Sequence, residues 1–463
     1  MSQPLRQPVH STLDLIGNTP LVEINHVDTG RCRLFVKLES QNPGGSIKDR
    51  IALSMIEAAE QSHKLKPGGT IVEATAGNTG IGLAQVGVLK GYRLLLVVPD
   101  KMAREKIEHL RALGAEVVVT RSDVGKGHPD YYQDKAKKLA AGLPHSYYIN
   151  QFANPANPAA HERTTAPEIW EQMEHDIDAV VVGVGSGGTL SGIGRYMKRV
   201  SPKTKMVLAD PEGSVLAPFI KTGEMIEAGS WAVEGIGEDF IPPNADLSLV
   251  AEAYSISDKD SIDAARLLLS REGILAGSSS GTLFAAALRY CREQTEEKRV
   301  VTLVCDNGNK YLSKVYNDYW AFEQGIHKRT LKGDLRDVIS TRFESGGAVT
   351  VGPDETLLIA YNRMRGADVS QLPVMDGGRL VGILDESDIL AAVEGYEYGR
   401  ADRFAKPVSS AMSRGLQIVQ IGDPLDSLLP IFARDRVALV CDKDRFVGLI
   451  TRMDLINYLR LHA

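Results

Sequence analysis

Short apolar runs alternate with longer helical patterns through roughly the first 320 residues. Segments such as Gly80–Lys90 and Ala103–Leu113 have the apolar spacing of helices. Between such segments lie runs typical of buried strands, and alternation of this kind predicts an α/β body with a parallel sheet. The predicted strands are Thr70–Ala74, Arg93–Val98, Ala115–Val119, Ala179–Val182 and Met206–Ala209.

The pattern changes at a polar stretch, Ala321–Asp334, which predicts a linker. Beyond it the segment Arg379–Leu390 returns as Arg445–Ile456, with each position shifted by 66 residues (379 to 445). Two copies of one small αβ unit usually pack together across a pseudo-two-fold axis. The sequence therefore predicts a body over residues 1–320, a linker over 321–334, and repeat copies over 335–396 and 406–463.

Composition excludes several classes of protein. The 463 residues include 53 basic and 59 acidic side chains, a net charge of −6, which argues against nucleic-acid or anionic-membrane partners. No run is apolar enough for a signal peptide or a membrane span, so we expect a cytoplasmic protein. Four scattered cysteines argue against a disulfide framework and a structural zinc site: Cys32, Cys291, Cys305 and Cys441.

Lys48 is the first candidate for chemistry. A flexible turn at Pro43–Gly45 precedes it, Ser46 is the expected N-cap, and the apolar spacing that follows predicts a helix. An amine at the positive end of a helix dipole loses its proton more easily, and a neutral amine can form a Schiff base. On spacing alone, a solvated surface lysine is the alternative.

The segment Gly183–Thr189 follows a strand and opens a helix. Backbone amides freed by glycine at a helix N-terminus bind phosphate without a basic side chain. Gly183, Gly185 and Gly188 also match a dinucleotide fingerprint, with Asp210 at the end of the next strand. That fingerprint normally opens a domain with its first strand, however, whereas this loop lies in the middle of the body.

Two further segments lie at strand-to-helix or loop-to-helix turns. In Glu73–Gly82, amides and hydroxyls suit a small carboxylate, and Asn78 offers an amide donor. Gly273–Thr282 is a glycine- and serine-rich turn before another helix. Simple helix capping is the alternative for both segments.

In combination, these four segments resemble the fold-type II pyridoxal-phosphate enzymes, and most closely the branch of cystathionine β-synthases and cysteine synthases. Leu15–Pro20 and Asn150–Pro158 also match that branch. The resemblance covers about residues 11 to 320, and the C-terminal repeat resembles a pair of CBS domains. It implies parallel and mixed sheets with helices on both faces, followed by a tandem CBS-domain module.

The resemblance also implies roles for individual residues. Lys48 would bind pyridoxal 5′-phosphate as an imine and act as the base. Asn78 would hydrogen-bond the cofactor's 3′-oxygen, and Ser279 would face its pyridine nitrogen. The cofactor phosphate would lie against Gly185, Ser186, Gly187, Gly188 and Thr189.

The amino-acid substrate would be held by a second set of residues. Gly235 belongs to Val233–Gly237, which resembles the mobile segment that closes over the bound substrate. Ala76 stands where many relatives have serine, which leaves its backbone amide available. The substrate carboxylate would contact Thr75, Ala76, Gly77, Thr79 and Gln151.

The implied reaction is a β-replacement that condenses L-serine with L-homocysteine to L-cystathionine and water in transsulfuration, and hydrogen sulfide production would be a separate side reaction. The alternatives are a cysteine synthase using O-acetylserine and sulfide, and a non-catalytic nucleotide-sensing protein. We expect no metal and no haem, because no cysteine precedes Cys32 to match the haem-binding extension of the animal enzymes.

The repeat implies an effector site for an adenosyl ligand, either S-adenosylmethionine or an adenine nucleotide. Asp388 and Asp454 occupy matched positions at helix starts. Thr451 lies three residues before Asp454, whereas Asp385 takes that place in the first copy, so we expect the ligand at Thr451 and Asp454. Helix capping by both aspartates is the alternative. We also expect a homodimer or a higher homo-oligomer.

Overall fold

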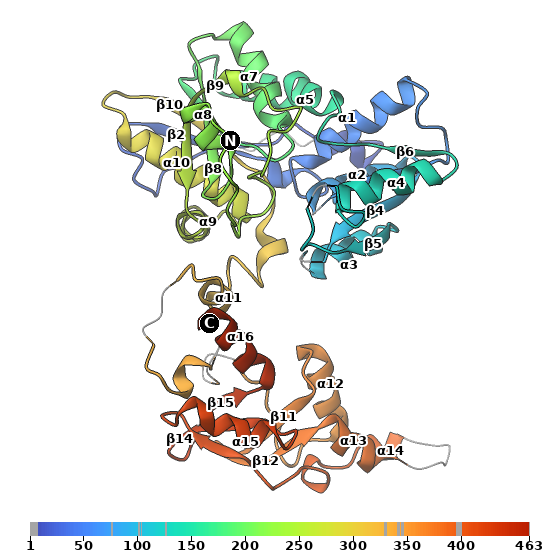
Figure 1. The fold of residues 1–463 in the computed structure, drawn as a ribbon, viewed down its shortest axis with the longest axis vertical. Helices are drawn as coiled ribbons and strands as arrows, with labels where there is room; N and C mark the ends of the chain where they lie inside the picture. Colours follow the sequence, from blue (N-terminus) through green and yellow to red (C-terminus); the bar gives the residue numbers. More distant parts are fainter. Residues whose placement is uncertain are drawn as a thin grey trace. The chain divides into compact units, whose positions relative to one another are not determined.

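The computed structural model describes residues 8–75, 77–100, 102, 104–125, 127–327, 331–339, 343, 347–394 and 401–462. The chain folds as two compact units, of which the first ends at Asn317 and the second begins at Asp318 (Figure 1). Within the described residues, no helix combines the length and apolar character needed to cross a bilayer.

The first unit contains two sheets, and the predicted α/β class with parallel and mixed sheets is confirmed. In the larger sheet, ordered β1-β2-β10-β7-β8-β9, β1 pairs antiparallel to β2 and the other strands are parallel. The smaller sheet, ordered β5-β4-β3-β6, is parallel throughout. The strands are β1 Leu21–Glu23, β2 Arg33–Leu38, β3 Thr70–Ala74, β4 Arg93–Pro99, β5 Glu116–Thr120, β6 Ser146–Tyr148, β7 Ala179–Gly183, β8 Lys205–Pro211, β9 Val250–Ile256 and β10 Arg299–Val304.

Helices connect these strands and pack on them. α1 packs against α2, and α10 packs against α9 and against β7, β8 and β10. The helices are α1 Lys48–Gln61, α2 Asn78–Leu89, α3 Arg104–Ala112, α4 Tyr132–Gly142, α5 Ala156–Ala160, α6 Ala166–Gln172, α7 Gly188–Val200, α8 Leu216–Thr222, α9 Asp258–Glu272 and α10 Ser278–Glu293. A π-helical turn, His161–Thr165, joins α5 to α6, and short 3-10 turns span Thr12–Leu15, Glu39–Gln41, Leu247–Leu249 and Gly308–Tyr311.

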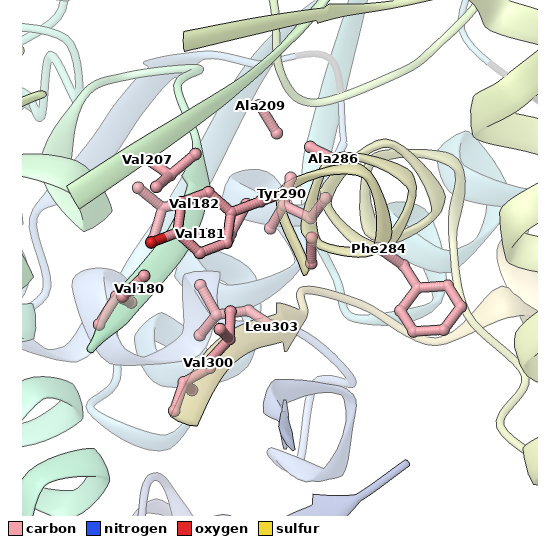
Figure 2. Close-up of a cluster of buried hydrophobic side chains, with 14 of the residues drawn as sticks. Val180, Val181, Val182, Val207, Ala209, Phe284, Ala286, Tyr290, Val300 and Leu303 are labelled. Atoms are coloured by element: carbon pink, nitrogen blue, oxygen red, sulfur yellow. The ribbon is translucent and has the colours of Figure 1, made fainter. Parts of the chain in front are cut away.

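The larger sheet is covered on both faces. Every residue from Ala179 to Val182 in β7 is buried, although successive side chains of a strand point to opposite faces. Figure 2 shows Ala286 and Tyr290 of α10 close to the valines of β7 and β8. Burying one such valine contributes about 1.5–3 kcal/mol, so the strand ends and the loops that follow them are held firmly in place.

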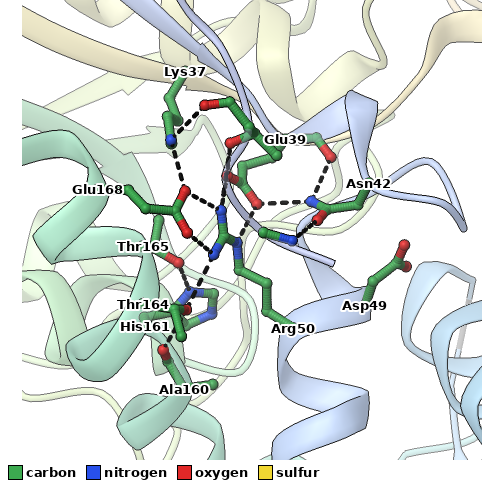
Figure 3. Close-up of polar contacts among 12 residues, drawn as sticks. Lys37, Glu39, Asn42, Asp49, Arg50, Ala160, His161, Thr164, Thr165 and Glu168 are labelled. Atoms are coloured by element: carbon green, nitrogen blue, oxygen red, sulfur yellow. Dashed lines mark hydrogen bonds and ion pairs between the residues drawn. The ribbon is translucent and has the colours of Figure 1, made fainter. Parts of the chain in front are cut away.

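A buried network of charges anchors the first turn of α1. The Arg50 guanidinium donates to both oxygens of Glu39 (2.7 and 2.8 Å) and to both oxygens of Glu168 (2.7 Å each) (Figure 3). Lys37 Nζ donates to Glu168 at 2.7 Å and to the Thr19 carbonyl at 2.7 Å. Two cations therefore face two carboxylates, which offsets the cost of burying them.

The electrostatics of Glu168 follow from this arrangement. Burial alone would raise the pKa of its carboxyl group, but hydrogen bonds from Arg50 and Lys37 outweigh burial and lower the pKa to about 2. Glu168 belongs to α6 and Glu39 follows β2, so Arg50 ties α1 to both elements. Lys48 lies two residues before Arg50 and is fixed with it.

The second unit shows the internal repeat directly. The hairpins β11–β12 and β14–β15 each carry a β-bulge at the matched step, Val374/Met375 and Val440/Cys441, and β12 contacts β15. Its helices are α11 Asp318–Glu323, α12 Leu357–Ala367, α13 Glu386–Val393, α14 Ala401–Phe404, α15 Leu429–Phe432 and α16 Arg452–His462. Its strands are β11 Gln371–Asp376, β12 Arg379–Asp385, β13 Ile418–Gln420, β14 Ala438–Asp442 and β15 Arg445–Ile450, with 3-10 turns at Leu335–Asp337, Val408–Ser410 and Leu425–Leu428.

Replacing Arg50 with leucine should lower the free energy of unfolding by about 3–5 kcal/mol, because Glu39 would be left buried without a cation and Glu168 would keep only Lys37. The matched control is Arg33→Leu. Arg33 also donates two hydrogen bonds to one carboxylate, Glu23, but this pair is solvent-exposed, so its loss should cost less than about 1 kcal/mol. Urea unfolding of the full chain checks both values; equal losses would contradict an anchoring role for Arg50.

Candidate active site

Three of the segments singled out from the sequence meet in the first unit. A Cβ on Gly185 would lie 2.5 Å from the Gly235 carbonyl oxygen, so these two backbones touch. The Gly237 amide donates to the Val184 carbonyl at 2.9 Å, and the Glu234 amide donates to Ser278 Oγ at 3.0 Å. The glycine loop 183–189, the segment 233–237 and the start of α10 therefore border one site.

Lys48 is the first residue of α1, as the sequence pattern predicts. The predicted N-cap is wrong by one residue, since Ile47 occupies that position. Ser46 instead forms an isolated bridge with Asp306, which delays the start of the helix. Its hydroxyl oxygen still accepts a hydrogen bond from the Lys48 amide at 3.2 Å.

The electrostatic surroundings of Lys48 favour a neutral amine. Burial lowers the pKa of Lys48, while Cys305, Asp306 and Glu238 oppose this effect. Among the described residues, the Lys48 amine has no hydrogen bond or ion pair. A partly desolvated amine without a fixed partner can act as a nucleophile or as a base.

The glycine loop before α7 is shaped by close contacts. Gly187 has φ +85°, and a Cβ on Gly188 would lie 1.8 Å from Asn157 Oδ1. Glycine is therefore required by space at Gly185 and Gly188 and by backbone conformation at Gly187. The loop opens the 13-residue helix α7, whose free amides and positive dipole end suit a phosphate group.

Asp210 does not support the dinucleotide alternative. It is fully buried at the end of β8, and its carboxylate accepts a hydrogen bond from the Ala217 amide at 2.8 Å. Burial raises the pKa of Asp210 to about 6. A carboxylate enclosed in this way is not available to a ribose, which the dinucleotide fingerprint requires.

The loop after β3 is bound to Gln151. Thr79 Oγ1 donates to Gln151 Oε1 at 2.7 Å, and Thr75 Oγ1 accepts from the Gly77 amide at 3.2 Å. The structure thus brings together four of the five predicted carboxylate-binding residues. The fifth, Ala76, lies outside the described residues.

Asn78 lies beside this loop and has partners on both sides of its amide group. Its Nδ2 donates to Asp306 Oδ2 at 2.7 Å, and its Oδ1 accepts from Lys310 Nζ at 2.9 Å. The Asn78 side chain also forms a hydrogen bond with Tyr311, so its amide hydrogens already have acceptors in the protein. Ser279 is buried in the first turn of α10, where its side chain interacts with the Cys305 thiol.

The sequence analysis missed a cluster of charges around Glu234. Glu234 forms ion pairs with Lys106, and with Lys314 at 2.7 Å, and these two cations lower its pKa despite burial. Lys106 Nζ would lie 3.4 Å from a Cβ on Gly77. The segment 233–237 is thereby tied to the loop after β3. No local pattern marks these lysines, which come from distant parts of the chain.

The sequence analysis also missed the role of Glu73, which opens the predicted segment 73–82 and lies near the end of β3. It is fully buried and accepts hydrogen bonds from the amides of Asn150 (2.7 Å) and Gln151 (3.4 Å). Burial outweighs these bonds and raises the pKa of Glu73 to about 8. The sequence signal that could have identified this role is the position of Glu73 directly before the loop after β3.

In the second unit, the predicted effector residues act as helix caps. Asp454 Oδ2 accepts from the Thr451 amide (2.7 Å) and hydroxyl (2.6 Å). Asp385 and Asp388 form a reciprocal capping box at 2.9 and 3.0 Å. A ligand at Asp454 would have to use its second carboxylate oxygen. The described part of the chain contains no group of three or more side chains that could hold a metal ion.

Glu73→Gln should change how stability depends on pH. Because the folded state raises this pKa from 4.5 to about 8, Glu73 contributes stability that is fully present below about pH 4.5 and is lost as pH rises through about 8. In that window the variant should remove a slope of at most about 1.4 kcal/mol per pH unit. Urea unfolding at several pH values measures this slope, and replacement of the exposed Glu296 by glutamine is the control. If the free energy of unfolding depends on pH in the same way in wild type and in Glu73→Gln, the raised pKa of Glu73 is disproved.

Comparison with known families accounts for both units. Residues 12–306 match the family described as "Pyridoxal-phosphate dependent enzyme", and residues 335–395 and 408–461 match the CBS domain. Two relatives are both named "Cystathionine beta-synthase". The one from Apis mellifera is 34% identical over 96% of this chain and 90% of the relative. The one from Mus musculus is 38% identical over 92% of this chain and 76% of the relative.

Solved structures support the same family. A hydrogen sulfide-producing enzyme from Fusobacterium nucleatum is 39% identical, with a TM-score of 0.62 over 66% of this chain and 100% of that one. An O-acetylserine-dependent cystathionine β-synthase from Helicobacter pylori is 38% identical, with a TM-score of 0.62 over 67% of this chain and 99% of that one. The chain therefore belongs to the pyridoxal-phosphate-dependent enzymes and carries a C-terminal pair of CBS domains.

Proposed function

We propose that the first unit condenses L-serine with L-homocysteine to form L-cystathionine and water. The observation that carries this proposal is Lys48, an amine of lowered pKa at the start of α1 in a chain of this enzyme family. The names of the relatives from Apis mellifera and Mus musculus support the reaction itself.

The residues of the site fit pyridoxal 5′-phosphate. The glycine loop, with the hydroxyls of Ser186 and Thr189, would hold the phosphate at the start of α7. Lys48 would bond to the aldehyde carbon, and Ser279 would meet the ring nitrogen. The Asn78 amide would donate to the 3′-oxygen in place of one of its present acceptors, Asp306 or Tyr311. When bound, the cofactor supplies an electron sink for the pair of electrons left at the substrate Cα.

The protein's own groups then have separate tasks. The Lys48 amine removes the Cα proton and later returns it, and its lowered pKa favours the neutral form that a base requires. Thr75, Thr79 and Gln151 orient the substrate carboxylate, together with the amides of Ala76 and Gly77. A serine hydroxyl at the ring nitrogen cannot hold that nitrogen as a cation, so expulsion of the β-substituent is favoured. The segment 233–237 closes the site against water.

The second candidate reaction is the synthesis of cysteine from O-acetylserine and sulfide. It should be tested alongside the first, because the Helicobacter pylori neighbour is O-acetylserine-dependent and the Fusobacterium nucleatum neighbour produces hydrogen sulfide. The two reactions share every residue of the site and differ in the leaving group and the acceptor.

We further propose that the protein is a homo-oligomer in the cytoplasm. The four free cysteines are consistent with a reducing compartment.

For the second unit we propose an adenosyl-ligand site on the copy that contains Thr451 and Asp454. The match to CBS domains supports this site, and the second carboxylate oxygen of Asp454 is the group that would contact a ribose.

We propose the same domain limits as those predicted from the sequence: 1–320 for the catalytic body, 321–334 for the linker, and 335–396 and 406–463 for the two copies. The matched family ranges support the limits of the copies.

Lys48→Ala should lower cystathionine formation by at least a thousandfold while the protein still folds, because one residue serves as both covalent partner and base. The control is Lys64→Ala, which removes an exposed lysine near the end of the same helix. Product assays should offer serine or O-acetylserine, each with homocysteine or sulfide. Near-normal turnover in Lys48→Ala would refute the proposed mechanism, and turnover restricted to O-acetylserine with sulfide would select the second reaction.

Asp454→Ala should abolish binding of an adenosyl ligand, whereas Asp385→Ala should leave it within about threefold of wild type. The reason is that Asp385 stands where the second copy has Thr451, so the first copy lacks the threonine of the proposed site. Calorimetric titration of the full chain with S-adenosylmethionine, AMP and ATP measures the affinities. Absence of heat with all three ligands, or equal loss in both variants, would refute the proposed site.

A further inference from the structure

Two side chains behind the glycine loop reach its two hydroxyl groups. Asn157 and His161 are four residues apart on one helical segment, so they lie on the same face. Asn157 contacts Ser186 and His161 contacts Thr189. Both are buried, with exposed fractions of 0% and 1%.

The direction of the first hydrogen bond is fixed by its surroundings. Asn157 Nδ2 lies 2.8 Å from the Gln151 carbonyl oxygen and 2.8 Å from Ser186 Oγ. A carbonyl oxygen can only accept, so the atom facing it must be the amide nitrogen. That nitrogen has no lone pair to offer, and Ser186 Oγ is therefore the acceptor. The Ser186 proton must point elsewhere.

The second hydrogen bond depends on the tautomer of His161. Its Nδ1 lies 3.0 Å from Thr165 Oγ1, and its Nε2 lies 3.4 Å from Thr189 Oγ1. Burial, with the charges of Lys48 and Arg50, lowers the pKa of His161, so the ring carries one proton. The Thr165 hydroxyl has no other hydrogen-bond acceptor among the described residues, so it donates to Nδ1. The ring proton then sits on Nε2 and faces Thr189.

Steric contacts show that the segment is packed tightly against α7. A Cβ on Gly188 would lie 1.8 Å from Asn157 Oδ1, and a Cβ on Gly192 would lie 2.7 Å from the His161 Cβ. His161 begins the π-helical turn, and such turns frequently occur at functional sites. Glycines on α7 therefore allow both side chains to approach the loop.

We propose that Asn157 and His161 are positioning residues that hold the hydroxyls of Ser186 and Thr189 as acceptors, so that both hydroxyl protons point at an anion in the loop. This inference rests on the proposed function, which puts the cofactor phosphate there. A phosphate oxygen accepts such protons in charge-assisted hydrogen bonds, which are stronger than neutral ones. Thr165 acts one step further away, by fixing the tautomer of His161.

The test compares pyridoxal 5′-phosphate with pyridoxal, which lacks the phosphate, as ligands of the full chain after removal of its cofactor. His161→Leu and Thr165→Val should each weaken binding of the phosphorylated ligand by about tenfold and change pyridoxal affinity by less than twofold. His161→Gln should recover most of the loss, because its amide can donate from a position close to that of Nε2. Thr302→Val is the control, since its buried hydroxyl bonds the Val181 carbonyl at 3.1 Å, away from the loop.

The outcomes separate the two proposals. Equal losses for both ligands would mean that these residues only support the fold, and would overturn the inference. Unchanged affinity in Thr165→Val would overturn it as well. A wild-type chain that binds pyridoxal as tightly as pyridoxal 5′-phosphate would instead remove the phosphate site on which the proposed function depends.

Discussion

The catalytic unit depends on the charges buried around Arg50. One guanidinium group reaches two carboxylates from different elements, Glu39 after β2 and Glu168 in α6, while Lys37 balances the second carboxylate. Such a network is costly to assemble unless every member is paired, and its geometry is therefore strongly restricted. The helix that begins at Lys48 inherits this restriction, because Arg50 belongs to its first turn.

The remaining site is organised by a second constraint, the close approach of backbones. Glycine allows the loop before α7 to touch the segment 233–237 on one side and Asn157 on the other. Hydrogen bonds from backbone amides and short side chains join these segments to one another. The cations Lys106 and Lys314 are occupied by Glu234. Lys48, by contrast, has no hydrogen bond or ion pair at its amine within the described part of the chain.

Much of this arrangement could be predicted from local sequence. The strand runs, the helix after Pro43–Gly45 and the 66-residue repeat are all periodic or punctuated patterns, and each appears in the structure. Contacts between distant segments could not be predicted. Lys106 and Glu234 each lie in a segment that the sequence singles out, but they are 128 positions apart, and no local pattern indicates that the two side chains pair. Ser46 failed as a helix cap for a similar reason, because its bridge to Asp306 comes from the far end of the unit.

The contact between Gly185 and Gly235 has a thermodynamic consequence. The segment 233–237, which we propose covers the substrate, rests on the same glycine loop that would bind the phosphate, so any movement of one shifts the equilibrium of the other. Coupling of this kind is reciprocal: if a bound cofactor favours the closed segment, then closure must retain the cofactor by the same factor. An enzyme built in this way would lose its cofactor mainly between turnovers, and a high concentration of substrate would protect it from that loss.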